Sequence, residues 1–169
     1  SETSKDDQED LVTSEKYEVI RTEDDLDKWC EEILKQKFFA IDTETTSLDT
    51  LSAEIVGVSL CIGIGKACYI PIAHQSDQSE HPEFEEKQLD RDIVLRKLQP
   101  LLADRSILKI GHNIKYDIKV LDKYKCYVNS IDDTMLMSHC INGGRQRHSL
   151  DSIAKDHLNH ETIKLKDLI

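Results

Sequence analysis

The sequence lacks any apolar run approaching ~20 residues, the length that a membrane-spanning helix requires. Its start, SETSKDDQED, is polar and acidic, so we expect no secretory signal peptide. It has five cysteines, an odd number, and no two of them have CxxC spacing. We therefore expect no disulfide framework, and we expect free thiols in a reducing cytoplasm.

Apolar residues are scarce at 38%, whereas charged residues make up 33% of the chain. Negative charge gathers near the amino terminus, where residues 1–32 hold thirteen Asp or Glu and four Lys or Arg. The remaining residues hold twenty acids and eighteen bases, so the net charge of −11 mostly describes that first stretch and does not exclude a nucleic-acid partner. We expect residues 1–15 to form an acidic flexible linker and residues 16–169 to form one domain.

Hydrophobic periodicity predicts alternating strands and helices. Thr22 and Ser149 are expected N-caps, and Gly143 with Gly144 is expected to end a helix. The order of elements predicts an α/β fold with a mixed sheet and helices on both faces, which is compatible with a ribonuclease-H-like architecture. The expected strands are 16–20, 37–42, a hairpin within 54–74, and 106–111; the expected helices are 22–36, 89–104 interrupted by Pro100, 113–124, 132–142 and 148–158; residues 75–87 are an expected loop.

The stretch FFAIDTETTSLD places acids directly after an apolar strand. Asp42 and Glu44 are two apart, so they project to the same side of a strand. Adjacent carboxylates repel one another unless protons or cations intervene, and Mg²⁺ prefers oxygen ligands of this kind. Taken alone, however, a DxE sequence is more often a solvated strand end.

The stretch KIGHNIKYD contains a second candidate group. Asn113 and Asp117 are four apart and would share a helical face, and Tyr116 adds an aromatic ring that could stack on a base. The alternative makes Asn113 an N-cap and Asp117 a surface acid.

Positive charge is concentrated between Arg105 and Val128. This basic island could follow phosphate groups, although lysines on an exposed helix face usually serve only solubility. Its six bases are Arg105, Lys109, Lys115, Lys119, Lys123 and Lys125, against the two acids Asp117 and Asp122.

Four stretches together carry a resemblance to a known family: FFAIDTETTSLD, GHNIKYD, IDDTML and GRQRHSLDSIAKDHL. In order and spacing they resemble the 3′–5′ proofreading exonuclease domain of bacterial DNA polymerase I, family A, from about residue 16 to the end. The resemblance implies a ribonuclease-H-like fold, two divalent ions, Mg²⁺ or Mn²⁺, and removal of nucleotides from a single-stranded DNA 3′ end.

The resemblance also implies roles for individual residues. Asp42, Glu44 and Asp117 match catalytic metal ligands, and Leu48 matches a side chain that wedges against the terminal bases. Leu165 falls where relatives carry an aromatic residue that stacks on DNA, so the chain departs from the family pattern there. Four further positions match residues that contact the DNA strand: His112, which replaces a frequent Gln, Asn113, Tyr116 and Arg147.

One family motif is absent. The Tyr-x-x-x-Asp motif, whose Asp is a metal ligand and whose Tyr orients the attacking water, does not occur after Asp117. We prefer the hypothesis that the sequence is a fragment truncated before this motif over the hypothesis that the motif was lost. In either case we expect this chain to bind at most one ion tightly and to be a weakly active or inactive nuclease.

The resemblance further implies a polymerase domain in the same longer chain, a bacterial cytoplasmic location and an isolated domain that is monomeric. Two alternatives remain open. One is a ribonuclease D-like exonuclease that acts on RNA, although the DTETTSLD detail separates the chain from those relatives. The other is a non-catalytic module that holds a 3′ end or scaffolds a polymerase.

Overall fold

The structure is a computed structural model that describes residues 16–74, 88–143 and 147–162. The expected linker 1–15, the expected loop 75–87, Gly144 and Leu165 lie outside the described residues.

The described residues form a six-stranded sheet with strand order β1-β4-β3-β2-β5-β6. The sheet is mixed, as predicted: β2, β3 and β4 pair antiparallel, whereas β1 joins β4 and β5 joins β2 and β6 in parallel. The apolar strand that carries the acids is therefore central. The strands are β1 (Lys16–Val19), β2 (Phe38–Thr45), β3 (Ile55–Gly63), β4 (Lys66–Pro71), β5 (Leu108–Gly111) and β6 (Ile131–Asp133).

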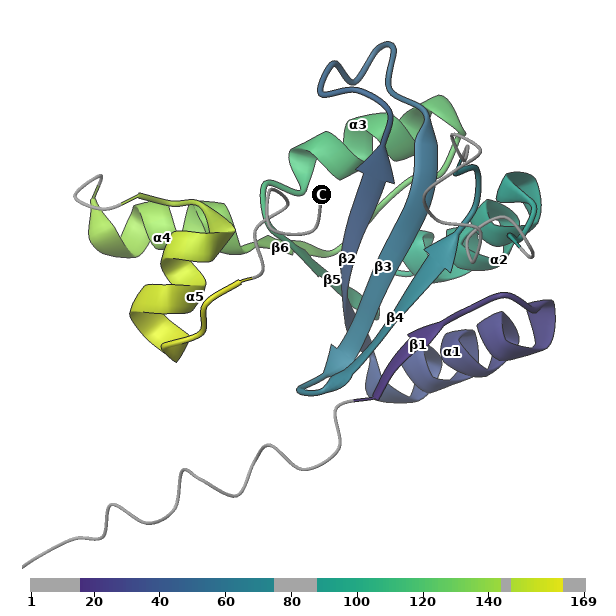
Figure 1. Cartoon of the computed structure of the whole chain (residues 1–169), viewed down its shortest axis with the longest axis horizontal. Coiled ribbons are helices and arrows are strands. Elements are labelled where there is room, and N and C mark those ends of the chain that lie inside the picture. The colour runs from purple at the N-terminus through teal and green to yellow at the C-terminus, as the bar shows by residue number, and fades with distance from the viewer. Residues whose placement is uncertain (1–15, 75–87, 144–146, 163–169) are drawn as a thin grey trace, which may run out of the picture.

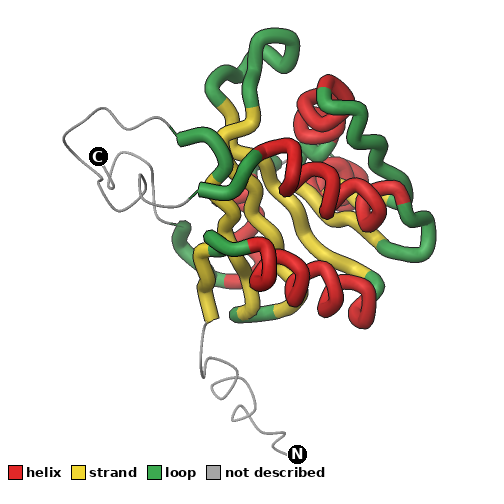
Figure 2. Tube along the Cα trace, turned by 90° about the vertical axis from the view of Figure 1, so that its right-hand side faces the viewer, coloured by secondary structure: helices red, strands yellow, loops and turns green. Residues whose placement is uncertain are grey.

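Three helices lie against one face of the sheet: α1 (Glu23–Gln36), α2 (Arg91–Ala103) and α3 (Lys115–Lys123) (Figures 1 and 2). The core between these layers buries Phe39 and Ile41 of β2 against helix residues such as Leu26 and Leu98. The remaining helices, α4 (Thr134–Asn142) and α5 (Leu150–Leu158), lie beyond β6 (Figure 1). Leu150 of α5 borders the opposite face of the sheet, where it lines a cavity with Ala40 and Cys61.

Several local signals act as the sequence predicts. Thr22 caps α1 by accepting a hydrogen bond from the Asp25 N–H at 3.2 Å, and Ser149 caps α5. Gly143 ends α4 with a φ of 55°, in the left-handed region that glycine adopts without strain. These signals are local, which is why the sequence alone reveals them.

Two expected elements are wrong in detail. The helix α2 is not interrupted at Pro100 but continues to Ala103. Pro100 lacks an N–H, yet it lies in the last turn, where buried Leu98 and Leu102 hold the chain against the core. Residues 131–133 form the short strand β6, although the expected helix 132–142 includes two of them, and α4 begins only at Thr134.

No helix in the described segments is long and apolar enough to cross a membrane. All five cysteines are free, as the odd count and the spacing predict.

Candidate metal and nucleic-acid site

The strand β2 is longer than predicted and carries its acids within the sheet. It pairs with β3 as far as Thr45, which faces Ile55. Alternation along the strand leaves Asp42 and Glu44 exposed and buries Thr43 between them on the other face. The sheet therefore presents the two carboxylates together at the end of a central strand.

The third acid, Asp117, reaches β2 from the first turn of α3 and is 3% exposed. Its Oδ1 accepts hydrogen bonds from the Thr43 backbone N–H at 2.9 Å and from the Thr43 hydroxyl at 2.6 Å. The alternative in which Asp117 is a surface acid is therefore wrong. Both bonds go to Oδ1, so they do not use the lone pairs of the second carboxylate oxygen, Oδ2.

The three acids influence one another's charge. Desolvation, the charge of Asp117 and the charge of Glu44 together raise the pKa of Asp42 to about 6, although its side chain is reached by solvent. Burial raises the pKa of Asp117, against hydrogen bonds from Thr43 that lower it. Carboxylates that resist ionisation next to one another are a suitable donor set for a hard divalent cation.

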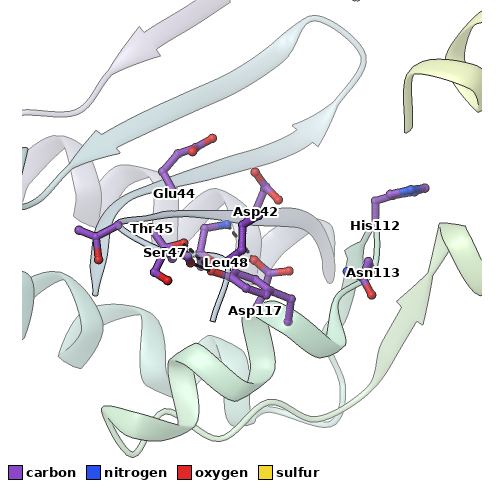
Figure 3. A pocket seen from close by; sticks show the side chains of 11 residues that line it. Asp42, Glu44, Thr45, Ser47, Leu48, His112, Asn113 and Asp117 are labelled. Atoms are coloured by element: carbon purple, nitrogen blue, oxygen red, sulfur yellow. Dashed lines mark hydrogen bonds between the residues drawn. The ribbon is translucent and has the colours of Figure 1, made fainter. Parts of the chain in front are cut away.

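A pocket of about 560 Å³ brings these acids together with most of the other predicted residues. Figure 3 shows Asp42 between Glu44 and Asp117 in that view, with His112 and Asn113 to one side. The pocket is lined by residues 42–48, His112, Asn113, Tyr116 and Asp117.

Leu48 stands at the edge of this pocket on the loop between β2 and β3, with its side chain 94% exposed. Tyr116 fixes the loop: its hydroxyl donates to the Ser47 carbonyl and shares a 2.5 Å hydrogen bond with the Thr45 hydroxyl. Asp49 closes the tip, because its carbonyl accepts the N–H of Ala53 at 2.8 Å. The hydrogen bonds of this loop thus hold the apolar side chain of Leu48 in a solvent-exposed position.

Thr134 holds the ring of His112. The Thr134 hydroxyl lies 3.1 Å from the Gly111 carbonyl oxygen, to which it can donate, and it shares a 2.9 Å hydrogen bond with His112 Nδ1. When Nδ1 is the donor in this bond, Nε2 of the neutral ring has a free lone pair.

Asn113 precedes α3 and does not share a face of that helix with Asp117. Its φ is 61°, and α3 is capped at Ile114 without a side-chain hydrogen bond, so the predicted helix start and N-cap are both wrong. The side-chain oxygen of Asn113 is buried and has no hydrogen-bond partner among the described residues. It is available to a ligand that enters the pocket.

Asp133 organises this corner, and the sequence reading assigned it no role. Its carboxylate accepts the N–H groups of Asn113 at 2.9 Å and Ile114 at 3.1 Å, and it also caps α4 through Met135. The sequence D-T-M-L signals an N-cap, but the contact with residues 113 and 114 depends on the tertiary fold.

Two sequence-based candidates do not join the pocket. Arg147 is exposed and is not among its lining residues. Lys109 was assigned to the exposed basic island, but it is 0% exposed, and its ammonium donates to the carbonyls of Asp104 and Ile107, both at 2.7 Å. The strand turns Lys109 under α2, so it cannot contact a phosphate.

No three His, Cys, Asp or Glu side chains in the described ranges are arranged as a ready cation-binding group. The carboxylate oxygens of Asp42, Glu44 and Asp117 are nevertheless ligands that suit Mg²⁺ or Mn²⁺. A bound cation would also relieve the electrostatic repulsion between Asp42 and its two acidic neighbours.

Comparison with known proteins decides the family. A family model described as 3′–5′ exonuclease matches residues 17–169. The chain belongs to this 3′–5′ exonuclease family. The resemblance to the exonuclease domain of bacterial DNA polymerase I is confirmed by relatives of that name. The exonuclease chain is 40% identical over 155 residues to DNA polymerase I of Pseudomonas aeruginosa and 34% identical over 163 residues to that of Rhizobium leguminosarum. In both comparisons it covers 90% of its own length and 16% of the relative's.

Solved structures confirm the ribonuclease-H-like α/β fold. Escherichia coli RNase D, an exoribonuclease, aligns with a TM-score of 0.65 at 22% identity, over 91% of the exonuclease chain and 36% of RNase D. Brucella melitensis NrnC with bound Mg²⁺ aligns with a TM-score of 0.60 at 23% identity, over 89% of the chain and 65% of NrnC. The polymerase-domain structure of Pol1 from M. smegmatis aligns with a TM-score of 0.65 at 19% identity, over 86% of the exonuclease chain and 23% of the Pol1 chain.

Proposed function

We propose that this exonuclease chain is the proofreading domain of a family A DNA polymerase and removes nucleotides from a single-stranded DNA 3′ end. The observation that carries the proposal is the single pocket in which three carboxylates meet an exposed leucine and a buried, unpaired amide oxygen. The relatives named DNA polymerase I, of which the chain spans 16%, support a polymerase domain elsewhere in the same longer chain. The same relatives support a bacterial cytoplasmic location.

In this proposal Asp42, Glu44 and Asp117 hold the divalent ions. Divalent ions held there would supply the positive charge that stabilises the attacking and leaving oxygens of a phosphodiester displacement. Thr43 fixes the Asp117 carboxylate through its two hydrogen bonds, so that acid is positioned before any ligand arrives. The two exposed acids supply the adjustable part of the site.

The other pocket residues hold the nucleic-acid strand. Leu48, displayed in water by its bonded loop, packs against the terminal base and excludes water from it. His112 accepts a hydrogen bond at Nε2, and Asn113 accepts one at its unpaired oxygen. Tyr116 has its hydroxyl committed to the loop, so only its ring is left for stacking. Arg147 contacts the same strand from outside the pocket, as the resemblance implies.

We expect this chain by itself, acting as a monomer, to bind one divalent ion tightly and to cleave slowly or not at all. Three carboxylates are few ligands for two ions, and no Tyr-x-x-x-Asp sequence follows Asp117 to add a fourth. Degradation of a 5′-labelled single-stranded oligonucleotide at an ordinary nuclease rate, with Mg²⁺ or Mn²⁺, would contradict this expectation.

Replacement of Asp42 by Ala tests the proposal itself. Binding of a single-stranded DNA oligonucleotide is measured with and without Ca²⁺, a cation that supports binding with little cleavage. We expect Ca²⁺ to strengthen binding to the wild-type chain and to have no such effect on Asp42→Ala. If binding by the two chains responds equally to the cation, and proofreading by the longer polymerase is also unchanged, a non-catalytic 3′-end-binding or scaffold module is the better assignment.

An RNA exonuclease is the second candidate, favoured by the alignment with RNase D. DNA and RNA oligonucleotides of one sequence separate the two. Tighter binding and faster cleavage of the RNA 3′ end would assign the chain to RNA, and a preference for DNA would support proofreading.

A further inference from the structure

A second pocket, of about 370 Å³, lies between α2 and the carboxyl-terminal end of α3. We call it the α2–α3 pocket. It shares no lining residue with the pocket that contains the acids, and Asp117 and Lys123 mark opposite ends of α3, about 9 Å apart along the helix axis. Its polar wall is formed by Asp92, Arg96, Gln99, Lys123 and Lys125.

The charge of this wall is positive in a chain of net charge −11. Lys123 is already engaged, because its ammonium donates to the Ala53 carbonyl and lies 4.0 Å from Glu54. Arg96 and Lys125 have exposed side chains, and neither side chain makes a hydrogen bond or ion pair with the described part of the chain. Two cations thus face the pocket without an internal counter-charge other than Asp92.

The position of Lys125 is also unusual for a lysine. Its φ is 60°, in the left-handed region where glycine is the ordinary residue. The backbone N–H groups of Tyr124, Lys125 and Cys126 all return to carbonyls at the end of α3, which locks this turn. The backbone thus fixes the point beside the pocket from which the Lys125 side chain extends.

Gln99 contributes an unsatisfied group. Its side-chain oxygen is inaccessible to solvent and has no hydrogen-bond partner among the described residues. Leaving such an acceptor unpaired costs free energy, which a ligand with a hydroxyl or amino group would recover. The pocket floor is apolar, formed by buried Leu95 and Cys126, so it also accepts the carbon skeleton of a sugar or base.

We propose that the α2–α3 pocket binds a phosphate-bearing ligand, either a free nucleotide or a phosphate of a polynucleotide strand. Arg96 and Lys125 bind the phosphate oxygens, and Gln99 turns its amide toward the pocket to accept a hydrogen bond from a hydroxyl or amino group of the same ligand. This site is independent of the acids and does not require cleavage. The pocket includes Lys123 and Lys125 of the basic island between Arg105 and Val128, but not Lys109.

Two variants with matched controls test the site. Lys125→Gly removes the cation and suits the left-handed backbone; Lys37→Gly makes the same change at another lysine with positive φ, 64°, that lies outside the pocket. Arg96→Gln is matched by Arg105→Gln, an exposed arginine outside the pocket. The probes are inorganic phosphate, deoxyadenosine 5′-monophosphate and a single-stranded oligonucleotide, each titrated without divalent cation while the amide signals of residues 95–99 and 123–126 are followed by NMR.

We expect at least one probe to shift those signals, and each pocket variant to weaken its binding by roughly tenfold, the effect of losing one charge-assisted hydrogen bond. The controls should bind as the wild type does. A response to the mononucleotide assigns a free ligand, and a response to the oligonucleotide alone assigns a strand. The proposal is overturned if no probe moves these signals, or if the pocket variants and the controls bind equally. Asp42 does not line this pocket, so we expect Asp42→Ala to leave its response to inorganic phosphate and to the mononucleotide unchanged, and failure of the proposed nuclease function is a separate result.

Discussion

Asp117 and Thr43 are 74 residues apart in sequence and are joined by two hydrogen bonds to one carboxylate oxygen. The backbone N–H of Thr43 lies 2.9 Å from Oδ1 and its hydroxyl lies 2.6 Å from it. These bonds attach the first turn of α3 to the central strand. They also lower the pKa of a carboxyl group whose pKa burial raises, so Thr43 offsets part of the cost of ionising a buried acid.

Thr43→Val should reveal this contribution. The substitution keeps the shape of the side chain but removes the hydroxyl donor, and we expect a loss of about 1–2 kcal/mol in the free energy of unfolding at pH 7. The pKa of Asp117 should rise further, and because a raised carboxyl pKa costs stability only where the group is ionised, the loss should shrink toward pH 3. Urea unfolding at both pH values measures the effect. Thr50→Val, at a hydroxyl for which the described segments offer no hydrogen bond, is the control and should change little at either pH.

The pH dependence of stability should report the repulsion around Asp42. Its pKa rises from the ordinary 3.8 to about 6 in the folded chain. A raised folded-state pKa gives stability that is complete below pH 3.8 and is lost as the pH rises through about 6. Because Asp42 is solvent-exposed, screening reduces the effect to on the order of 1 kcal/mol.

The comparison chain for this measurement is Asp42→Asn, which cannot ionise. We expect the wild-type chain to lose stability relative to Asp42→Asn between about pH 4 and pH 6, and millimolar Mg²⁺ to restore it at pH 7 by neutralising the carboxylates. If the stabilities of the two chains change equally across this pH range, with and without the cation, the neighbouring acids do not raise the pKa of Asp42.

Lys109 should be essential for stability although it lies far from any ligand. Its ammonium donates hydrogen bonds to the carbonyls of Asp104 and Ile107, just after α2, and its aliphatic stem is buried. Lys109→Met keeps most of the apolar stem but leaves buried carbonyls without a donor, so we expect a loss of about 2–4 kcal/mol. Thermal unfolding measures it, with the exposed Lys119→Met as control. Equal melting temperatures for the two variants would mean that water replaces the ammonium.

The outcome for Lys109 illustrates where sequence reasoning reached its limit. Periodicity predicted the elements and their order, because strands and amphipathic helices carry local patterns, and it placed Asp42 and Glu44 on one side of a strand. It could not show that α2 covers the face of β5 onto which Lys109 projects. The positive charge of Lys109 predicted an exposed side chain, but the tertiary fold buries it.

Short elements and distant contacts were missed for a related reason. The strand β6 has only three residues, Ile131–Asp133, too few to show alternation, and the helix signal that follows obscured it. The resemblance indicated seven residues that line the pocket and one, Arg147, that does not. Composition and spacing alone left each of them with an ordinary interpretation, as a strand end, cap, core, loop or surface residue. The roles of Thr43 and Asp133 come from hydrogen bonds between segments, and a single sequence holds no signal for these.

Asp133 gives the last prediction, since one carboxylate joins three parts of the fold. It accepts the backbone N–H groups of Asn113 and Ile114, which lead into α3, and those of the first turn of α4. Asp133→Ala removes a helix cap worth ~1 kcal/mol and leaves two further N–H groups without their acceptor, so we expect a loss of about 2–4 kcal/mol. Hydrogen exchange of the amides of Asn113 and Ile114 should accelerate together with that of Met135.

The neighbouring Asp132→Ala is a close control, because it removes the same charge one residue away and breaks no hydrogen bond among the described residues. It should leave those exchange rates and the unfolding midpoint nearly unchanged. If the proposed function is right, Asp133→Ala should also weaken binding of a DNA 3′ end, because residues 112 and 113 would lose the backbone position that directs them into the pocket. Equal exchange and equal binding in the two variants would show that the Asp133 carboxylate does not hold these N–H groups in place and would remove its proposed part in shaping the site.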